Sequence, residues 1–307
     1  MIKLLFLCDK KYWDNKMSRV RFHSAEAIFR HENILGVKDG NGFDGWIDAE
    51  HSVKKHSPDI IFWYKPLEIN GYENISIPKV ISYNEMYDIE NTKKEILKSK
   101  TDIVICHLKN DIKKYENTNF NLYNIPHCIE KTIFKDYKEN KKYDVLLAGV
   151  VSKDTYPLRY KFQKIIKDNL LKNLNVKILN HPGYRIRNVN DQVYNYAKEL
   201  NRSKLVLSCS SIYKYALAKY VEVPACGSLL LADIPDERNE FFKNLIIPIN
   251  ISMSENEIVE IINFWAKSNN EREKKIKLNY NLIMENYTQE HYSQQFYKII
   301  KNYLNNG

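Results

Sequence analysis

One stretch of the sequence places two charged side chains beside residues that shape the backbone. Lys219 and Glu222 lie three residues apart, and therefore on one face of a helix, while Pro224 and Gly227 follow just before the apolar run Leu229–Leu231. A carboxylate at the edge of a buried strand can accept hydrogen bonds from a bound ligand. It can equally pair with Lys219 on a solvated helix. The residue types alone leave both interpretations open.

A second candidate site follows the apolar run Asp144–Ala148. Gly149 ends this run, and Pro157 is suited to the first turn of a new helix. A short loop between a strand and a helix can hold an anion, because unpaired amides and the helix dipole point toward it. Lys153 and Arg159 would add positive charge. In the alternative interpretation, Gly149 only permits a positive φ in an ordinary turn.

A third loop is rich in hydroxyl groups. Ser208–Ser211 follow an apolar run and precede a stretch, Tyr215–Val221, that is compatible with a helix and that Pro224 is expected to stop or kink. Ser210 and Lys214 are the candidates for ligand contact in this loop.

A fourth set of polar residues follows the first apolar run of the chain. Arg19, Arg21 and His23 would lie in the loop and first helical turn after that run, where they could bind a second substrate. The alternative, a solvated start of a helix, is slightly favoured.

Two series of apolar runs must position these residues. Runs of this continuous kind are typical of strands buried on both faces of a parallel sheet. The first series is Lys3–Cys8, Asp59–Tyr64, Lys79–Ser82 and Asp102–Cys106, and the second is Asp144–Ala148, Asn175–Leu179, Lys204–Ser208 and Gly227–Leu231. Polar or amphipathic segments alternate with them, so the fold class is α/β, with two Rossmann-like domains facing each other across a cleft.

The domain boundaries follow from charge and periodicity. The charged stretch Phe134–Lys142 has no apolar period and is interpreted as a linker, so residues 1–134 form the first domain and 135–286 the second. Residues 287–307 carry Tyr292, Phe296, Ile299 and Ile300 at helical spacing. They are predicted to form a helix that packs back on the first domain.

Composition and charge indicate which partners and which cellular compartment to expect. The 307 residues are 44% hydrophobic and carry a net charge of +9, which favours anionic partners such as nucleotides or anionic surfaces. The lysines are scattered, so a solvated surface is favoured over a dedicated nucleic-acid face. No targeting or transmembrane segment is visible. The five cysteines form no CxxC pair and predict reduced thiols in a cytoplasmic protein.

Several of these segments together resemble a known family. Lys219–Gly227 resembles the Arg-x-x-Glu-x-x-Ala-x-Gly signature of GT-B glycosyltransferases, in particular the family 4-like group that includes spore-maturation-type proteins. Lys142–Gly149, Tyr156–Arg159 and Ile125–Phe134 are similar to that group's second-domain strand and glycine loop, its helix start and the segment that closes its first domain. The motifs cover residues 125 to 231, and the N-terminal third resembles the family only in its strand pattern.

The resemblance assigns roles to the donor-binding candidates. It implies that Glu222 accepts hydrogen bonds from the ribose hydroxyls of a nucleotide-sugar, and that Lys219, where the family commonly has arginine, neutralises the diphosphate. Ala225 and Gly227 would let the backbone approach the donor. The donor-binding set is completed by residues of the two loops already described: Gly149, Lys153 and Arg159 from the first, and Ser210 and Lys214 from the second.

The acceptor side departs from the family pattern. Where family members often carry a histidine or an acid after a middle strand, this chain has Tyr83–Asp88, so Glu85 and Asp88 join His23 as catalytic candidates, with Arg19 and Arg21 on the acceptor side. His107 and His127 also follow apolar runs, where a lone histidine is more often structural. The sequence has no Asp-x-Asp motif, so no required metal or other cofactor is expected.

The resemblance implies a function, and alternatives stay open beside it. The expected activity is transfer of a sugar from a nucleotide-sugar, UDP- or GDP-linked, to an unidentified acceptor, which could be a glycan, protein, lipid or nucleic acid. The resemblance alone implies retention of configuration. The alternatives are an epimerase-like enzyme of the same fold and a non-catalytic binder of nucleotides or nucleic acid.

Overall fold

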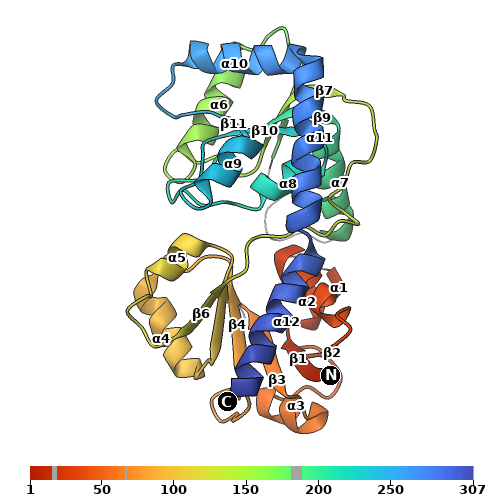
Figure 1. The fold of residues 1–307 in the computed structure, drawn as a ribbon, viewed down its shortest axis with the longest axis vertical. Coiled ribbons are helices and arrows are strands. Elements are labelled where there is room, and N and C mark those ends of the chain that lie inside the picture. Colours follow the sequence, from red (N-terminus) through yellow and green to blue (C-terminus); the bar gives the residue numbers. More distant parts are fainter. Residues whose placement is uncertain (16–18, 66–67, 181–188, 307) are drawn as a thin grey trace. The chain divides into compact units, whose positions relative to one another are not determined.

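The chain forms two compact units. The computed structural model describes all residues except 16–18, 66–67, 181–188 and 307, and gives only the backbone for 19–20 and 189–191. Unit 1 comprises Met1–Cys128 and Gln289–Gly307, and unit 2 comprises Ile129–Thr288 (Figure 1). The chain therefore passes between units at 128/129 and 288/289, whereas the sequence predicted 134/135 and 286/287. Each unit contains one parallel sheet with helices, which confirms the predicted pair of α/β domains.

The sheet of unit 1 has six strands in the order β2-β1-β3-β4-β5-β6, all parallel. Its strands are β1 (Ile2–Leu7), β2 (Ile34–Asp39), β3 (Ile60–Tyr64), β4 (Lys79–Tyr83), β5 (Ile103–Cys106) and β6 (Asn121–Asn124). Its helical segments are α1 (Lys10–Asn15), the π-helix η1 (Arg19–His23), α2 (Ser24–Phe29), α3 (Ala49–His56), α4 (Ile89–Ser99), α5 (Lys109–Lys113) and α12 (Gln289–Asn306).

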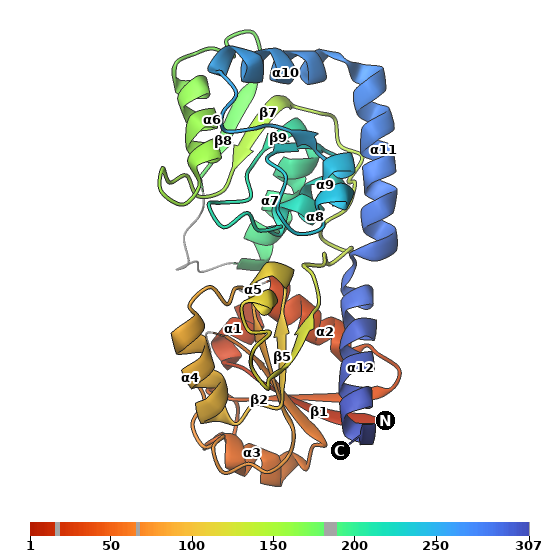
Figure 2. The same ribbon diagram turned by 60° about the vertical axis from the view of Figure 1, so that its left-hand side comes forward.

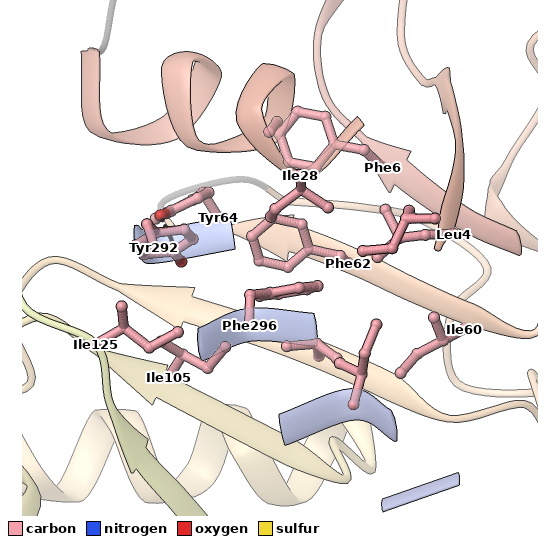
Figure 3. Close-up of a cluster of buried hydrophobic side chains, with 14 of the residues drawn as sticks. Leu4, Phe6, Ile28, Ile60, Phe62, Tyr64, Ile105, Ile125, Tyr292 and Phe296 are labelled. Atoms are coloured by element: carbon pink, nitrogen blue, oxygen red, sulfur yellow. Dashed lines mark hydrogen bonds between the residues drawn. The ribbon is translucent and has the colours of Figure 1, made fainter. Parts of the chain in front are cut away.

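The terminal helix α12 supplies part of the core of unit 1. Its apolar stripe buries Tyr292, Phe296 and Ile300 completely, and Ile299 packs at the edge of the same cluster. Figure 3 shows Tyr292 beside Tyr64 and Phe296 beside Phe62. The Phe296 ring lies 4.8 Å from the ring of Phe62 in β3. The helical spacing in the sequence therefore marks a face that contributes to the first sheet's core, although α12 is distant from that sheet in sequence.

The sheet of unit 2 has five parallel strands in the order β11-β10-β9-β7-β8. Strands β7, β8 and β9 can be followed in Figure 2. Its strands are β7 (Tyr143–Ala148), β8 (Val176–Leu179), β9 (Ser203–Leu207), β10 (Leu229–Ala232) and β11 (Ile247–Pro248). Its helices are α6 (Pro157–Lys167), α7 (Val189–Asn201), α8 (Lys219–Ala225), α9 (Asn239–Leu245), α10 (Glu255–Lys267) and α11 (Asn269–Asn286).

Helix α6 shows how sequence signals position a site element. Pro157 occupies its first turn, where a missing amide hydrogen costs no hydrogen bond. Leu158, Phe162 and Ile165 are buried on one face against β7 and β9, as their spacing predicts. This packing fixes the start of α6 beside the loop that follows β7.

Both sheets reverse their strand order at one place. In unit 1 the chain continues to opposite sides of β1, to β2 on one side and β3 on the other; in unit 2 β7 is flanked in the same way by β8 and β9. At such a switch point the loops after two neighbouring strands diverge, which leaves a crevice at the carboxyl ends of the strands. Ligand sites are therefore expected between β1 and β3 and between β7 and β9.

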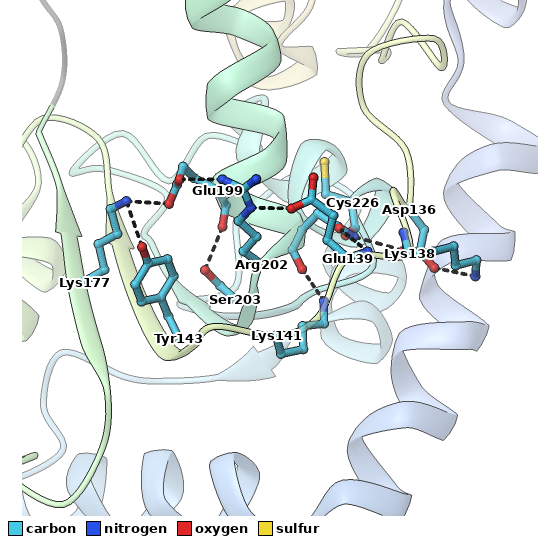
Figure 4. Close-up of polar contacts among 11 residues, drawn as sticks. Asp136, Lys138, Glu139, Lys141, Tyr143, Lys177, Glu199, Arg202, Ser203 and Cys226 are labelled. Atoms are coloured by element: carbon cyan, nitrogen blue, oxygen red, sulfur yellow. Dashed lines mark hydrogen bonds and ion pairs between the residues drawn. The ribbon is translucent and has the colours of Figure 1, made fainter.

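The predicted linker is wrong. Residues of Phe134–Lys142 form a polar network at the amino ends of the unit 2 strands (Figure 4). Asp136 accepts a hydrogen bond from Asn201 at 3.0 Å, and Lys141 Nζ donates to the carbonyl oxygen of Asn201 at 2.6 Å. Glu139 pairs with Arg202. Ion pairs and hydrogen bonds to backbone groups hold this stretch in place, so it needs no periodic pattern of apolar residues. The missing pattern is the reason why the sequence resembled a linker.

Two general expectations concern the whole chain. All five cysteines are buried free thiols. Across the residues that the model describes, no helix has both the length and the apolar character needed to cross a bilayer.

Candidate functional site

Two cations converge on the glycine that follows β7. Gly149 has φ +108°, which glycine adopts most readily. A Cβ atom at this position would lie 2.8 Å from Arg159 Nη1, 3.1 Å from Lys219 Cε and 3.3 Å from Lys219 Nζ. Gly149 therefore does more than permit a turn, because its missing side chain lets the two cations approach the same point.

The guanidinium of Arg159 is held in place by the protein. Arg159 lies in the first turn of α6 and is only 3% exposed. Its Nη1 donates to the carbonyl oxygen of Val150 at 2.8 Å, and its Cζ lies 3.9 Å from the centre of the Tyr156 ring. Within the described residues its buried Nε has no hydrogen-bond partner. A fixed cation of this kind is suited to binding an anion without first having to become ordered.

Glu222 lies on the same helix as Lys219, and a tyrosine contacts both. Glu222 is 3% exposed, and its Oε2 accepts a hydrogen bond from Tyr196 Oη at 3.1 Å. Lys219 Nζ lies 5.6 Å from the centre of the Tyr196 ring, within cation–π range. The sequence analysis missed Tyr196, because it lies in α7, 26 residues from Glu222.

The hydroxyl-rich loop after β9 is organised by an acid that the sequence analysis also missed. Asp233, directly after β10, accepts hydrogen bonds from the amide and the hydroxyl of Ser210 at 2.7 and 2.5 Å, and from Lys214 Nζ at 2.8 Å. Ser211 and Lys214 both have positive φ, at +69° and +55°. Strained backbone of this kind persists where surrounding contacts enforce it, and it is common at functional sites.

The loops after β7 and β9 touch each other at the switch point of unit 2. The Ile212 amide donates to the carbonyl oxygen of Thr155 at 3.0 Å. This hydrogen bond joins the Gly149 loop to the loop of Ser210 and Lys214. Lys153, the remaining cation of the Gly149 loop, is exposed.

Two of the predicted donor contacts lie elsewhere. Gly227 precedes β10, so it lies at the amino edge of a parallel sheet whose carboxyl edge carries Gly149. Its φ is +65°, and a Cβ atom there would lie 3.2 Å from Asp136 Cγ. Ala225 is fully buried at the end of α8. These small residues therefore allow tight packing of the sheet's amino edge, and they are not brought to the Gly149 loop.

The predicted helix near Pro224 also differs from the structure. The sequence indicated a helix over Tyr215–Val221 that Pro224 stops or kinks, whereas α8 spans Lys219–Ala225 and contains Pro224. The helix still ends one residue after this proline, and the Cys226 amide donates to the carbonyl oxygen of Glu222. The proline lies in the last turn, so only one internal hydrogen bond is lost.

In unit 1 a pocket lies at the carboxyl end of β1. Its lining includes Arg21, which was predicted on the acceptor side, together with Asp9 and Tyr12. His23 is 4% exposed at the start of α2 and is not among the residues that line the pocket. The backbone of Arg19 lies in η1, but its side chain falls outside the described residues.

The two acidic candidates of unit 1 follow β4. Asp88 caps α4, since its carboxylate accepts hydrogen bonds from the Asn91 amide at 3.2 Å and from Asn91 Nδ2 at 2.7 Å. Glu85 is exposed as a residue, but its carboxyl group loses part of its hydration. This desolvation, together with the negative charge of Asp111, raises the pKa of Glu85. Buried Asp111 fixes this loop by accepting a hydrogen bond from the Met86 amide at 2.6 Å. Neither candidate lines the pocket at β1.

Of the two histidines that follow apolar runs, His107 is buried and His127 is partly buried. His107 is 3% exposed, its Nδ1 lies 2.8 Å from the carbonyl oxygen of Ile125, and its ring stacks on His127 at 4.6 Å. Burial lowers the pKa of His107 to about 4, so it is neutral at physiological pH. Such a histidine is structural, in line with the sequence-based interpretation.

The described residues include no group of three or more His, Cys, Asp or Glu side chains arranged to hold a metal ion. The arrangement that the structure does provide is a pair of cations at a glycine loop beside a buried carboxylate. That combination is suited to a ligand that carries both a diphosphate and a hydroxylated ring.

Comparisons with known proteins identify the family and the fold of the chain. A family model described as "Glycosyl transferase-like" matches residues 132–298, which is just over half of the chain. A solved glycosyltransferase from Rickettsia africae is similar, with 14% identity, a TM-score of 0.61 and coverage of 100% of this chain and 99% of that one. No curated protein matches the sequence.

Two further solved structures share the fold. Anabaena HepE in complex with UDP-glucose has 11% identity and a TM-score of 0.60, covering 98% of this chain and 100% of its own. A putative UDP-N-acetylglucosamine 2-epimerase from Listeria monocytogenes has 9% identity and a TM-score of 0.53, covering 100% of this chain and 97% of its own. With the two parallel-sheet domains, these likenesses confirm the GT-B fold class.

Proposed function

Because the chain belongs to the glycosyl transferase-like family, we propose that it transfers a hexose from a nucleotide-sugar to an acceptor. We place it in the family 4-like group, in the spore-maturation-protein-type subgroup, on the motifs around Gly149 and Glu222. A UDP-linked donor is supported by the fold it shares with Anabaena HepE, whose structure contains UDP-glucose.

One observation carries this proposal. Arg159 and Lys219, which are 60 residues apart in sequence, meet at Gly149 on the carboxyl side of the β7/β9 switch point. Two cations at one glycine favour an anion with more than one charge, because each cation otherwise repels the other. The diphosphate of the donor would lie here, with the Ser210 and Lys214 loop alongside it.

The same residues would lower the barrier to transfer. When the bond from the sugar to the diphosphate breaks, negative charge develops on the departing UDP. Arg159 and Lys219 would stabilise that charge, so the reaction is proposed to need no metal. Retention of configuration is proposed from the family resemblance.

Glu222 would accept hydrogen bonds from the ribose hydroxyls. Its carboxylate is 3% exposed and already bonded to Tyr196, so the donor can reach it only if the surroundings of Glu222 rearrange on binding. Tyr196 would then hold one carboxylate oxygen while the other receives the ribose.

Binding and turnover of the donor test the proposal. Melting of the wild-type protein is followed with UDP, GDP and UDP-glucose, since a ligand that prefers the folded form raises the melting temperature. We expect UDP and UDP-glucose to raise it, and slow release of UDP from UDP-glucose without an acceptor. Glu222→Gln should lower donor affinity by roughly tenfold to a hundredfold, because a charged hydrogen-bond acceptor is lost.

A matched variant separates this effect from a general loss of charge. Glu260 is exposed on α10, so Glu260→Gln removes the same charge away from the site and should leave donor affinity unchanged. Equal affinity of the Glu222→Gln and wild-type proteins for UDP, or no shift with any nucleotide, would contradict the proposal.

An epimerase-like reaction is the second candidate, and the fold shared with the Listeria protein favours it. The two reactions differ in their products. A transferase releases UDP from UDP-glucose or another UDP-sugar, whereas an epimerase returns an isomeric UDP-sugar with the nucleotide still attached. Binding of UDP without either product would indicate a non-catalytic nucleotide binder.

A further inference from the structure

Asp233 joins two of the elements that form the site in unit 2. It directly follows β10, so it lies at the carboxyl edge of the sheet. Its carboxylate accepts hydrogen bonds from the amide and the hydroxyl of Ser210 and from Lys214 Nζ, all on the loop after β9. Its backbone oxygen accepts a hydrogen bond from the Tyr220 hydroxyl at 2.6 Å. Asp233 therefore holds this loop and also the first turn of α8, which carries Lys219.

Tyr220 connects Asp233 to the cations at Gly149. The Tyr220 side chain is fully buried. Burial and the negative charge of Asp233 raise the pKa of its hydroxyl, while the positive charge of Arg159 acts in the opposite direction. The hydroxyl therefore lies in the electric field of both charged groups. Asp233 and Arg159 thus belong to one charged cluster at the carboxyl edge of the sheet.

The contacts of Asp233 divide the loop after β9 into an anchor and an exposed cation. Ser210 is fully buried, and both its amide and its hydroxyl donate to Asp233. Lys214 donates one hydrogen bond to Asp233 at 2.8 Å, and 41% of its side chain is exposed. An ammonium group has three N–H donors, so Lys214 can bond a ligand while it stays bonded to Asp233. Ser210 therefore fixes the loop, and Lys214 is the group that can reach a ligand.

The segment after Asp233 holds the backbone of the same loop. The Asp236 amide donates to the carbonyl oxygen of Lys214 at 3.0 Å, and Glu237 Oε1 accepts a hydrogen bond from the Ala216 amide at 3.1 Å. These contacts enforce the left-handed backbone of Lys214, whose φ is +55°. Because the backbone is held in this way, the Asp233 carboxylate controls the direction of the Lys214 ammonium group.

We infer that Asp233 is a positioning residue for the transfer reaction, which aims the Lys214 ammonium group at the leaving diphosphate. The inference rests on the proposed transferase function. During transfer the bond between the sugar carbon and the phosphate oxygen breaks, and its electron pair stays on that oxygen. The acceptor hydroxyl, or water when no acceptor is present, bonds to the carbon and releases its proton to the solvent. Lys214 stabilises the charge that develops on the diphosphate, as Arg159 and Lys219 do.

The rate and the affinity of one variant test the inference. Asp233→Asn keeps an oxygen for the Ser210 amide but replaces the oxygen that Lys214 bonds by an amide group. The rate of UDP release at saturating UDP-glucose should fall about tenfold, less than for a fully buried donor, because Lys214 is partly exposed. UDP affinity should stay equal or rise, because a negative charge near the diphosphate is removed. A merely structural role would instead weaken UDP binding and lower the melting temperature.

A double variant shows whether Asp233 acts through Lys214. Lys214→Met should also lower the rate about tenfold, because the ammonium group is lost. Asp233→Asn combined with Lys214→Met should be no slower than Lys214→Met alone, because the carboxylate then has no cation to position. Lys214→Arg can still pair with Asp233 and should keep most of the rate. As a control, Asp236 is exposed and contacts the loop through its amide, so Asp236→Asn should change the rate less than twofold.

The outcomes separate this inference from the proposed function. If the wild-type protein releases UDP from UDP-glucose and Asp233→Asn does so at the same rate, the inference is overturned while the donor site stands. A double variant about a hundredfold slower than wild type would overturn it as well, because independent effects multiply. Weaker UDP binding by Asp233→Asn with a lower melting temperature would assign Asp233 a structural role and also overturn it. A wild-type protein that neither binds UDP nor releases it from UDP-glucose would remove the transferase, and the role of Asp233 with it.

Discussion

The two units share a strand order but differ at its switch point. In unit 2 the crevice between β7 and β9 is built from a glycine and two converging cations, Arg159 and Lys219. In unit 1 the corresponding place, between β1 and β3, is built from aromatic rings with one acid and one guanidinium. The same topology therefore carries different chemistry in the two units, because the side chains after the strands differ.

The distribution of charge sharpens this difference. Unit 2 contains 26 lysines and arginines and 19 aspartates and glutamates, whereas unit 1 contains 21 and 19. The basic character of the chain thus belongs mainly to the unit that carries the proposed diphosphate site. A net charge quoted for the whole chain conceals this, because the nearly neutral unit 1 is averaged with the basic unit 2.

The largest expected effect comes from removing one buried aromatic ring from the hydrophobic core of either unit. Phe296 and Phe162 are fully buried in units 1 and 2, so Phe296→Ala and Phe162→Ala should each destabilise their own unit by about 3–5 kcal/mol. Calorimetry with and without UDP checks this. UDP should raise the melting of unit 2, so the transition lowered by Phe162→Ala is the one that responds to UDP. A single transition lowered equally by both variants would show that the units do not unfold separately.

How far the sequence predicts the fold depends on where a strand lies. All eight apolar runs are strands, and they include every central strand of both sheets. The three missed strands, β2, β6 and β11, all lie at sheet edges. An edge strand has one neighbour and retains solvent contact, so it need not be continuously apolar: Leu35 of β2 is 51% exposed. Apolar runs therefore identify the centre of a sheet better than its margin.

The same reasoning explains which site residues were predicted. Lys219 and Glu222 were visible because helical spacing relates neighbours in sequence, and Gly149 because a glycine after a strand is a local signal. Tyr196 and Asp233 were missed because each reaches its partner from another element of the fold. Gly227 was predicted to approach the donor, but it lies at the amino edge of the sheet. A motif gives the order of its residues, but it does not show that α8 runs from Lys219, at the carboxyl edge, toward Gly227 at the amino edge.

The second prediction compares buried lysines at the amino edges of the two sheets. Lys141 in unit 2 donates to two backbone oxygens, and burial lowers its pKa from 10.5 to about 8. Burial also lowers the pKa of Lys79 in unit 1. Between pH 8 and 10.5 the unfolded chain binds more protons at Lys141 than the folded chain. The unfolding free energy of unit 2 should therefore rise with pH in this window, by about 3 kcal/mol relative to Lys141→Met.

Urea unfolding of both proteins across this window measures the difference, and all other titrating groups cancel in the comparison. Lys79→Met should alter the pH dependence of unit 1 instead, in the same direction. A difference between wild type and Lys141→Met that is constant from pH 8 to 10.5 would mean that Lys141 titrates normally in the folded protein.

The third prediction separates the two reasons for a glycine at position 149. Gly149→Ala introduces a left-handed alanine and also a Cβ atom 2.8 Å from Arg159 Nη1. Gly45 of unit 1 also has positive φ, +73°, but a Cβ atom there meets only Lys55 Nζ at 3.9 Å. Gly149→Ala should cost roughly 2 kcal/mol more than Gly45→Ala, the cost of forcing an extra carbon into a packed place. Melting measures this cost, and UDP affinity should fall only in Gly149→Ala. Equal costs in the two variants would show that Gly149 serves the turn alone.

The smallest expected effect concerns the tyrosine that joins the two charged residues of α8. Tyr196→Phe removes the hydrogen bond to Glu222 but keeps the ring beside Lys219. The carboxylate loses one donor, so donor affinity should fall by about fivefold, near 1 kcal/mol, with little change in the rate at saturating UDP-glucose. Tyr292→Phe is the matched change in unit 1, where it removes the partner of Tyr64, and it should leave UDP affinity unaltered. If Tyr196→Phe instead lowered the rate at saturating donor and left affinity intact, Tyr196 would act on the transition state, and the role of Glu222 as a ribose acceptor would lose its support.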